Sequence, residues 1–275
     1  GGSPTIVFGT DQPLDAAGTV FSRAGLPVAE GYLVEPHDST VDPSLTGDRV
    51  REIIDEARAE ADRVRAAVRL PLSSRTRMVI AVADTSGEVL GLFRMRDATF
   101  FSLDVAVAKA RNTAYFADAD PTSFNPLDGI DGIPAGTAFT NRTFRFLSEP
   151  RFPDGIDGSP PPAFSILNND TIDPKTGLNR PGMVATVGSF DREVDVDNGS
   201  VLGYDAFFPN TNFHDPNEVS NQNGIVFFPG SAPLYVSSLL VGGLGVSGDG
   251  VDQDDVVTAA GTAASDGLFL PPAEL

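Results

Sequence analysis

Residues Met78–Arg111, MVIAVADTSGEVLGLFRMRDATFFSLDVAVAKAR, decide the fold because they read as strand, tight turn, strand, short loop and helix. Residues 79–83 are apolar on both faces, which is typical of a central strand. A Thr-Ser-Gly turn follows, and residues 88–95 return as the partner strand. Ser102 can then cap a helix whose apolar residues repeat at helical spacing up to about residue 117.

Working outward, the chain contains a second hairpin and two further helices. The second hairpin joins strands 233–236 and 239–247 through a Ser-Ser turn. One helix is expected near 47–69 and another near 251–265, and Pro71 is expected to end the first. The order helix, hairpin, helix, insertion, hairpin, helix predicts an α+β fold, with an antiparallel sheet and its helices on one side.

Two ordered blocks of the sequence resemble one protein family. The first is IAVADTSGEVLGLFRM…D…SLDVAVAKAR, within residues 80–111, and the second is FPGSAPLYVSSLLVGGLGVSGDGVDQDD, residues 228–255. They are similar to the conserved core and closing segment of the GlcG/HbpS-like family, also called PduO C-terminal-like. The resemblance covers regions 46–118 and 224–270. It implies a profilin-like fold, association with haem or related tetrapyrroles, and a tendency to form oligomers.

The remaining residues frame this core. Residues 1–45 are expected to form an N-terminal arm or linker with short strands at 5–8 and 32–34. Residues 46–270 form the predicted domain, and 271–275 a tail. Within the domain, residues 119–223 are rich in Pro, Gly, Asn, Asp and Phe, and we interpret them as an insertion lying on the core. Gly1-Gly2-Ser3 is typical of a tag or of a cut through a longer chain.

The composition restricts the classes of partner. The net charge of −19 argues against binding to nucleic acid or to an anionic membrane surface. No apolar run reaches the roughly 18 residues that a membrane helix needs. The absence of cysteine excludes disulfides, thiolate catalysis and thiolate metal ligands. The loop-rich composition favours an extracytoplasmic location, periplasmic or secreted.

The candidate ligand-binding residues are two histidines and two cations. Haem iron takes an axial His, Tyr, Cys or Met ligand, and the only histidines are His37 and His214. Haem-binding relatives often carry a histidine on the first helix, where this chain has none between Glu56 and Ala61. Arg94 and Lys109 match basic positions of the family and could hold the carboxylates of a tetrapyrrole or another anion. The favoured alternative is that Arg94 with Asp97, and Lys109, form structural ion pairs that link loop, sheet and helix.

Two further features allow alternatives. Asp154 and Asp157, in a turn rich in Asp and Gly, offer the oxygen ligands that calcium prefers, although such turns often need no ion. The acidic run 249–255 complements the dipole of the predicted last helix without any metal. Glycines 242, 243 and 245 imply close approach by another backbone or by a ligand, and they offer a surface for a homo-oligomer.

No catalytic motif is present, so the sequence favours a protein that is not an enzyme. The favoured function is a ligand-binding module that resembles the haem-binding GlcG/HbpS-like proteins. The alternative is a structural or interaction domain of a larger extracytoplasmic protein. A haem-degrading enzyme ranks last, because no acid–base pair or nucleophile can be named.

Overall fold

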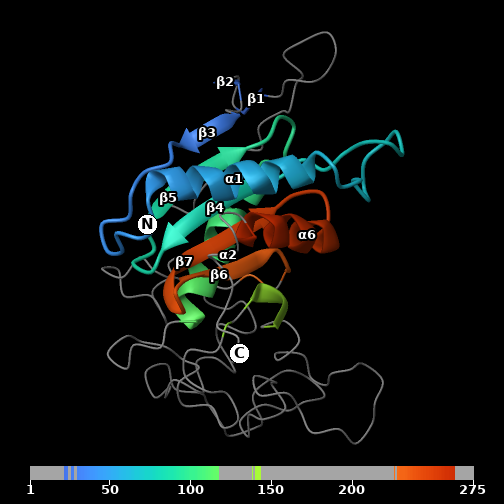
Figure 1. Ribbon diagram of the computed structural model, residues 1–275. Coiled ribbons are helices and arrows are strands. Elements are labelled where there is room, and N and C mark those ends of the chain that lie inside the picture. The colour runs from blue at the N-terminus through green and yellow to red at the C-terminus, as the bar shows by residue number, and fades with distance from the viewer. Residues whose placement is uncertain are drawn as a thin grey trace, which may run out of the picture.

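A five-stranded antiparallel sheet organises the part of the chain that the computed structural model describes, namely residues 22–23, 26–27, 30–117, 138, 140–143, 226 and 228–263. Its strand order is β3-β5-β4-β7-β6 (Figure 1). The strands are β3 Gly31–Val34, β4 Val79–Asp84, β5 Val89–Arg94, β6 Ser231–Val236 and β7 Leu239–Ser247. The helices are α1 Gly47–Ala61, α2 Ser102–Phe116 and α6 Val251–Thr262, while β1 Ser22–Arg23 and β2 Leu26–Pro27 pair separately. The predicted α+β class and antiparallel sheet are confirmed.

The two predicted hairpins meet along β4 and β7. These strands pair without a break from Val79 opposite Ser247 to Asp84 opposite Gly242. All six residues of β4 are buried, as expected for a strand that is apolar on both faces. The N-terminal segment adds β3 to the other side of β5, so the strand predicted at 32–34 is confirmed. The strand predicted at 5–8 lies outside the described residues.

The prediction that the helices share one side of the sheet is wrong. Helices α1 and α6 lie side by side on one face, and α2 covers the opposite face (Figure 1). The reason is the alternation of β7. Leu244 faces Gly261 of α6, whereas Gly243 and Gly245 face the backbone of α2. Sequence order alone did not reveal this alternation, because β7 is buried on both faces.

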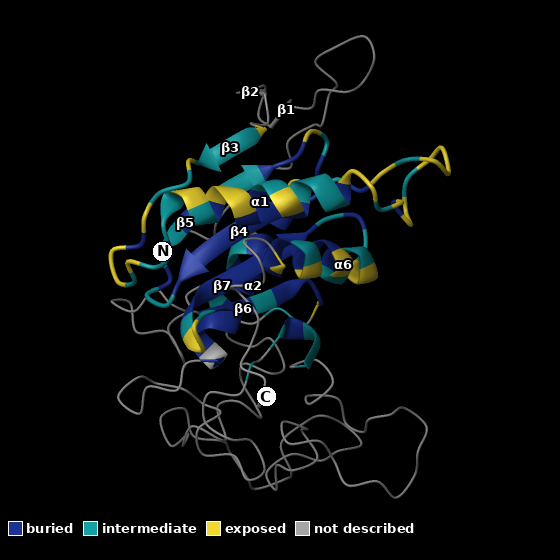
Figure 2. Ribbon diagram, viewed as in Figure 1, coloured by how far each residue is buried: buried dark blue, intermediate teal, exposed yellow. Residues whose placement is uncertain are grey.

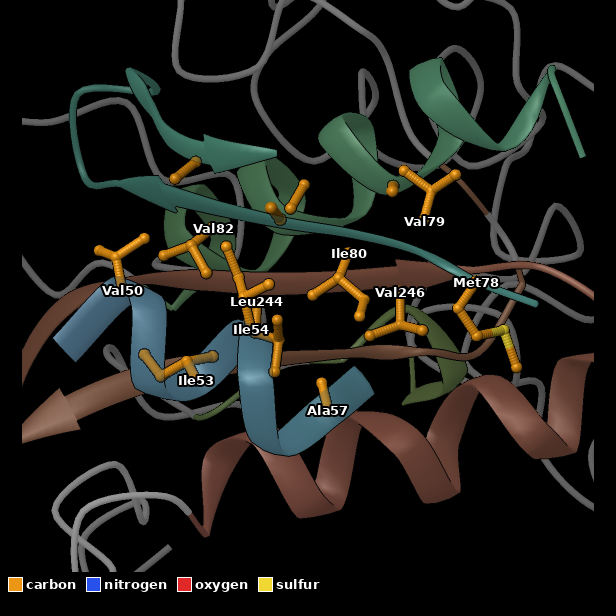
Figure 3. Close-up of a cluster of buried hydrophobic side chains, with 14 of the residues drawn as sticks. Val50, Ile53, Ile54, Ala57, Met78, Val79, Ile80, Val82, Leu244 and Val246 are labelled. Atoms are coloured by element: carbon orange, nitrogen blue, oxygen red, sulfur yellow. The ribbon is translucent and has the colours of Figure 1, made fainter. Parts of the chain in front are cut away.

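The main apolar core lies between the sheet and α1. Figure 3 shows side chains of α1 facing side chains of the two central strands. The labelled residues are Val50, Ile53, Ile54 and Ala57 from α1, Ile80 and Val82 from β4, Leu244 and Val246 from β7, and Met78, together with Val79 of β4, which points to the other face of the sheet. All are at most 1% exposed, so the core is closed to water.

The glycines of β7 permit a very short distance between strand and helix. A Cβ atom added at Gly243 would lie 2.1 Å from the carbonyl oxygen of Ala110, and one added at Gly245 would lie 2.1 Å from that of Ala106. The close approach predicted for these glycines is therefore made by the backbone of α2. Because this face of β7 is covered within the chain, it is not the oligomer surface that the sequence indicated.

Helix α1 is shorter than the predicted range 47–69, and Pro71 does not end it. It ends at Ala61, whose carbonyl accepts a hydrogen bond of 2.8 Å from the Thr76 hydroxyl. The chain then turns back on itself, since Arg65 and Arg75 form an antiparallel bridge. We call residues 62–77 the arginine arm; it projects beyond α1 (cyan in Figure 1). The valines at 64 and 68 continued the helical spacing in the sequence, but Val68 is exposed in the arm.

No helix in the described part of the chain is long and apolar enough to cross a membrane. Residues 140–143, from the segment predicted as an insertion, contact the core. The Asn141 amide N–H donates to the Ser231 hydroxyl at 2.9 Å, and its side-chain amide donates to Asn112 at 3.0 Å. The rest of the predicted insertion, and the predicted tail 271–275, lie outside the described residues.

The glycine contact makes a testable prediction about stability. We expect Gly245→Ala to lower the free energy of unfolding by about 3 kcal/mol, because the methyl group must displace the α2 backbone. Urea unfolding followed by circular dichroism measures the change. Leu239→Ala, at the start of the same strand where the side chain is 69% exposed, is the control and should change stability little. Equal effects of the two substitutions would contradict this account of the packing.

Candidate functional site

His37 lies in a loop that is clamped between β5 and the start of α1. Its backbone N–H donates to the Leu90 carbonyl at 3.1 Å. The next residue, Asp38, accepts from the Gly47 N–H at 2.8 Å, and Ser39 donates its hydroxyl to Asp84 at 2.7 Å. These three bonds tie residues 37–39 to the sheet and to α1. The loop therefore holds the histidine in a fixed position.

The imidazole of His37 has a distinct contact at each nitrogen. Its Nδ1 lies 3.0 Å from the Glu35 carbonyl, and its Nε2 lies 3.4 Å from a carboxylate oxygen of Glu88. Both partners are hydrogen-bond acceptors, so the neutral ring can donate to only one of them, and the tautomer that donates from Nδ1 keeps its lone pair on Nε2. The carbonyl of Glu35, followed by the carboxylate of Glu88, raises the pKa of His37 above its ordinary value. The side chain is 42% exposed, so Nε2 can be approached from solvent.

Arg94, the last residue of β5, is buried. One of its Nη atoms donates to the Ala98 carbonyl at 2.6 Å, which closes the loop that follows the strand. Burial lowers the pKa of Arg94 despite attraction from Glu30 and Asp97. Asp97, the structural partner expected for Arg94, accepts a hydrogen bond from Arg69 of the arginine arm.

Lys109 is fully buried and forms an ion pair across the molecule. Its Nζ donates to Asp254 Oδ2 at 2.9 Å and to the Val246 carbonyl at 2.7 Å. The pair therefore joins α2, on one face of the sheet, to α6 on the other. A ligand carboxylate could reach this amine only by displacing Asp254, so the geometry matches the structural alternative for Lys109.

Gly230 closes the space around this pair. Its φ of +107° favours glycine, and a Cβ there would lie 2.5 Å from the Asp254 side chain and 3.0 Å from Lys109 Nζ. The second carboxylate oxygen of Asp254, Oδ1, is buried without a hydrogen-bond partner. Burial outweighs the attraction of Lys109 and raises the pKa of Asp254 to about 6. Burial likewise lowers the pKa of Lys109.

The other acids near the start of α6 have partners within the chain. Asp249 accepts from Arg69 and from the Arg77 backbone N–H. Asp252 and Asp255 both accept from Arg142. Among the described residues, no three His, Cys, Asp or Glu side chains are grouped so that they could hold a metal ion.

The described candidates do not form one site. His37 is bonded beside Leu90, whereas Arg94 lies four residues further along the same strand, about 13 Å away. Lys109 belongs to α2, and its amine is directed toward Asp254 of α6 rather than toward His37 or Arg94. His214, Asp154 and Asp157 lie outside the described residues, so their predicted roles as haem and calcium ligands stay predictions.

Sequence reasoning missed the partners of the two best-placed residues. Asp254 was read as one of several acids complementing a helix dipole, although it is the one that neutralises Lys109. Its place in the first turn of α6, where it points inward beside Val257, was the only available signal. Glu88 gave no signal, because 51 residues separate it from His37.

The comparisons with known proteins give a match to one family model over part of the chain. Residues 183–263 match the family described as "Haem degrading protein HbpS-like". The resemblance to this family that the two sequence blocks indicated is therefore confirmed. No curated protein matches the chain.

Several solved structures are similar to this chain at low identity. A complex titled "PduOC:Heme" is 16% identical, with 81% of this chain and 96% of that chain covered and a TM-score of 0.43. Protein ORFY of Klebsiella pneumoniae is 14% identical, with coverage of 78% and 85% and a TM-score of 0.40. A double mutant of Streptomyces reticuli HbpS is 15% identical, with coverage of 84% and 89% and a TM-score of 0.33.

The buried pair makes a prediction about pH. The Asp254 carboxyl holds its proton more tightly in the folded protein than at its ordinary pKa of 3.8. Its contribution to stability is therefore fully present below that value and is lost as the pH rises through about 6. We expect Asp254→Asn to remove this part of the pH dependence. The advantage of the native protein over the variant should then shrink between about pH 4 and about pH 7.

Urea unfolding of both proteins across this pH range measures the difference. Asp252→Asn is the matched control, since that side chain is 81% exposed in the same helix turn. Parallel stability curves for the native protein and Asp254→Asn would show that the buried carboxyl does not titrate as described.

Proposed function

We propose that this chain, which resembles the HbpS-like family, is a non-catalytic ligand-binding module whose ligand is a tetrapyrrole or another small anion. The observation that carries the proposal is the family match over residues 183–263, in agreement with the block at 78–111. The surroundings of His37 support a non-catalytic role. Its ring contacts a carbonyl and a carboxylate, rather than a hydroxyl that it could activate.

His37 fits an axial haem ligand among the described residues. A ligating histidine usually donates its other ring N–H to a carbonyl or carboxylate, and Nδ1 of His37 faces the Glu35 carbonyl in this way. When bound, haem supplies an iron that takes an axial nitrogen. The chain would present Nε2 from a loop that three hydrogen bonds hold in place, so little ordering is needed on binding.

Helix α1 offers no haem ligand at the position where the family resemblance implies a histidine. Ala57 and Ala61 are fully buried in the core, Arg58 pairs with Asp55, and Glu60 pairs with Arg63. Arg94 and Lys109 are both buried, and each donates to atoms of the chain. Among the described residues that were predicted to contact a ligand, His37 is therefore the one with an accessible ligating atom, Nε2.

A haemin titration followed by visible absorption tests this function. We expect a saturable Soret shift in the native protein and an affinity reduced at least about tenfold in His37→Ala. Added imidazole should partly restore the spectrum of that variant. His214→Ala is the companion variant, and it should bind haemin as the native protein does.

The pH dependence of the titration provides a second readout. Protonation of His37 removes the lone pair that would bind iron, so haemin affinity should fall as the pH drops through the raised pKa of His37. Glu88→Gln removes one cause of the raised pKa and should move this loss to lower pH. No Soret shift, or one that neither histidine substitution changes, would favour the alternative below.

The second candidate function is an interaction domain of a larger protein. It is favoured by the arginine arm, which presents Val68, Leu70 and Leu72 to solvent with exposed fractions of 73%, 82% and 68%. Exposed aliphatic groups gathered on a projecting segment are typical of protein contacts.

Calcium binding by Asp154 and Asp157 is tested separately. An ion that binds only the native state raises the melting temperature of the protein by mass action. We expect the melting temperature to be higher in excess Ca²⁺ than in excess chelator, and Asp154→Asn/Asp157→Asn to abolish the difference. Equal melting temperatures of the native protein in both solutions would rule the site out.

A further inference from the structure

We propose that the arginine arm, residues 62–77, docks on the outer surface of helices α1 and α6 of a second copy of this chain. The proposal goes beyond ligand binding and does not depend on it. Two surfaces carry it: the projecting arm, which is apolar and cationic, and a helical surface that is apolar and acidic.

The arm differs in charge from the rest of the protein. It holds five arginines and one aspartate, and this leaves 14 of the 19 basic residues and 37 of the 38 acidic residues elsewhere. Three of the arginines pair with carboxylates of the chain, Arg63 with Glu60, Arg69 with Asp97 and Asp249, and Arg77 with Asp62. Arg65 and Arg75 instead donate to the carbonyls of Leu72 and Arg63. Both side chains are exposed, and no carboxylate in the part of the chain that the structure describes is bonded to either of them.

The arm is built as a fixed structure. The backbone of Ala66 donates to Ser74 at 2.9 Å and that of Thr76 donates to Val64 at 3.0 Å, so the two halves are paired. Arg69 reaches back to the core, where Asp249 is only 3% exposed. A preformed arm binds without a large cost in ordering.

The tip of the arm exposes Val68, Leu70 and Leu72 together. Single exposed aliphatic residues need no explanation, but three within five residues on one projection form a patch that excludes water when covered. Figure 2 shows this projection as mostly exposed.

The receiving surface is the outer side of the α1–α6 pair. Helix α6 exposes Val256 and Ala259, and its C-cap residue Ala263 is exposed as well; the three are spaced by three and four residues along one side. Helix α1, packed beside α6, exposes the carboxylates of Glu52 and Glu56. An apolar strip next to acidic side chains is complementary to aliphatic residues flanked by arginines.

The arm is anchored beside the start of α6. Asp249, which anchors Arg69 of the arm, lies two residues before the first residue of α6. In a dimer with two-fold symmetry each copy offers both surfaces to the other. A second copy is favoured over an anionic membrane because the acidic remainder of the chain repels anionic lipid, whereas it attracts the arm.

Charge reversal tests the contact. We expect the native chain, of 28.9 kDa, to sediment near twice that mass at high concentration. Arg65→Glu/Arg75→Glu and Glu52→Lys/Glu56→Lys should each sediment as monomers, because like charges then meet at both contacts. An equimolar mixture of the two variants should recover the dimer, since each reversed arm meets a reversed helix.

The apolar part is tested by Leu70→Ser/Leu72→Ser, which should weaken the dimer at least about tenfold. Leu239→Ser is the matched control, because Leu239, the first residue of β7, is 69% exposed. Near-ultraviolet circular dichroism and the melting temperature verify that every variant is folded.

Three results would overturn the proposal: a native monomer at high concentration, a dimer that the arm substitutions leave intact, or a mixture of charge-reversed variants that stays monomeric. Co-sedimentation with phosphatidylglycerol vesicles is measured in parallel. Arm-dependent vesicle binding by a protein that is monomeric in solution would assign the arm to lipid instead.

Discussion

The close approach of α2 to β7 is the constraint on which the rest of the structure depends. Gly243 and Gly245 let the helix backbone lie against the strand, and no other residue type fits between them. This distance brings Lys109 to the end of the strand, where its amine meets the Val246 carbonyl and Asp254. The two helix layers are thus joined by one buried pair as well as by apolar packing. Replacing either side chain would leave the other polar group buried without its hydrogen-bond partner, which costs far more than an exposed pair contributes.

This constraint also determines which residues remain for function. Because the amine of Lys109 is bonded to Asp254 and joins α2 to α6, the match of Lys109 to a basic position of the family does not by itself indicate a ligand. His37 differs, since the hydrogen bonds of its loop are made by the backbone and by its neighbours, and its Nε2 faces outward beside Glu88. A residue whose loop is held in place by hydrogen bonds of its backbone and neighbours is preorganised for binding.

The sequence predicted the sheet well and the site poorly, for physical reasons. The hairpins, their strand boundaries and three helices follow from local periodicity and turn residues, and these signals are contained within short windows. The end of α1 was missed because Val64 and Val68 keep the helical spacing. The Thr76 hydroxyl, which donates a hydrogen bond to the Ala61 carbonyl, comes 15 residues later in the chain. The Lys109–Asp254 pair spans 145 residues, a separation at which no local pattern carries information.

The acidic composition of the chain determines which forces act between the arginine arm and a partner. A net charge of −19 makes copies of the chain repel one another, and salt weakens this repulsion over a distance of about 10 Å. Salt also weakens the attraction between exposed arginines and the carboxylates of α1. The two effects oppose each other, so charge alone would give little net affinity and would mainly fix which surfaces meet. The aliphatic tip, whose burial is insensitive to this screening, must then supply most of the affinity of any partner that the arm binds.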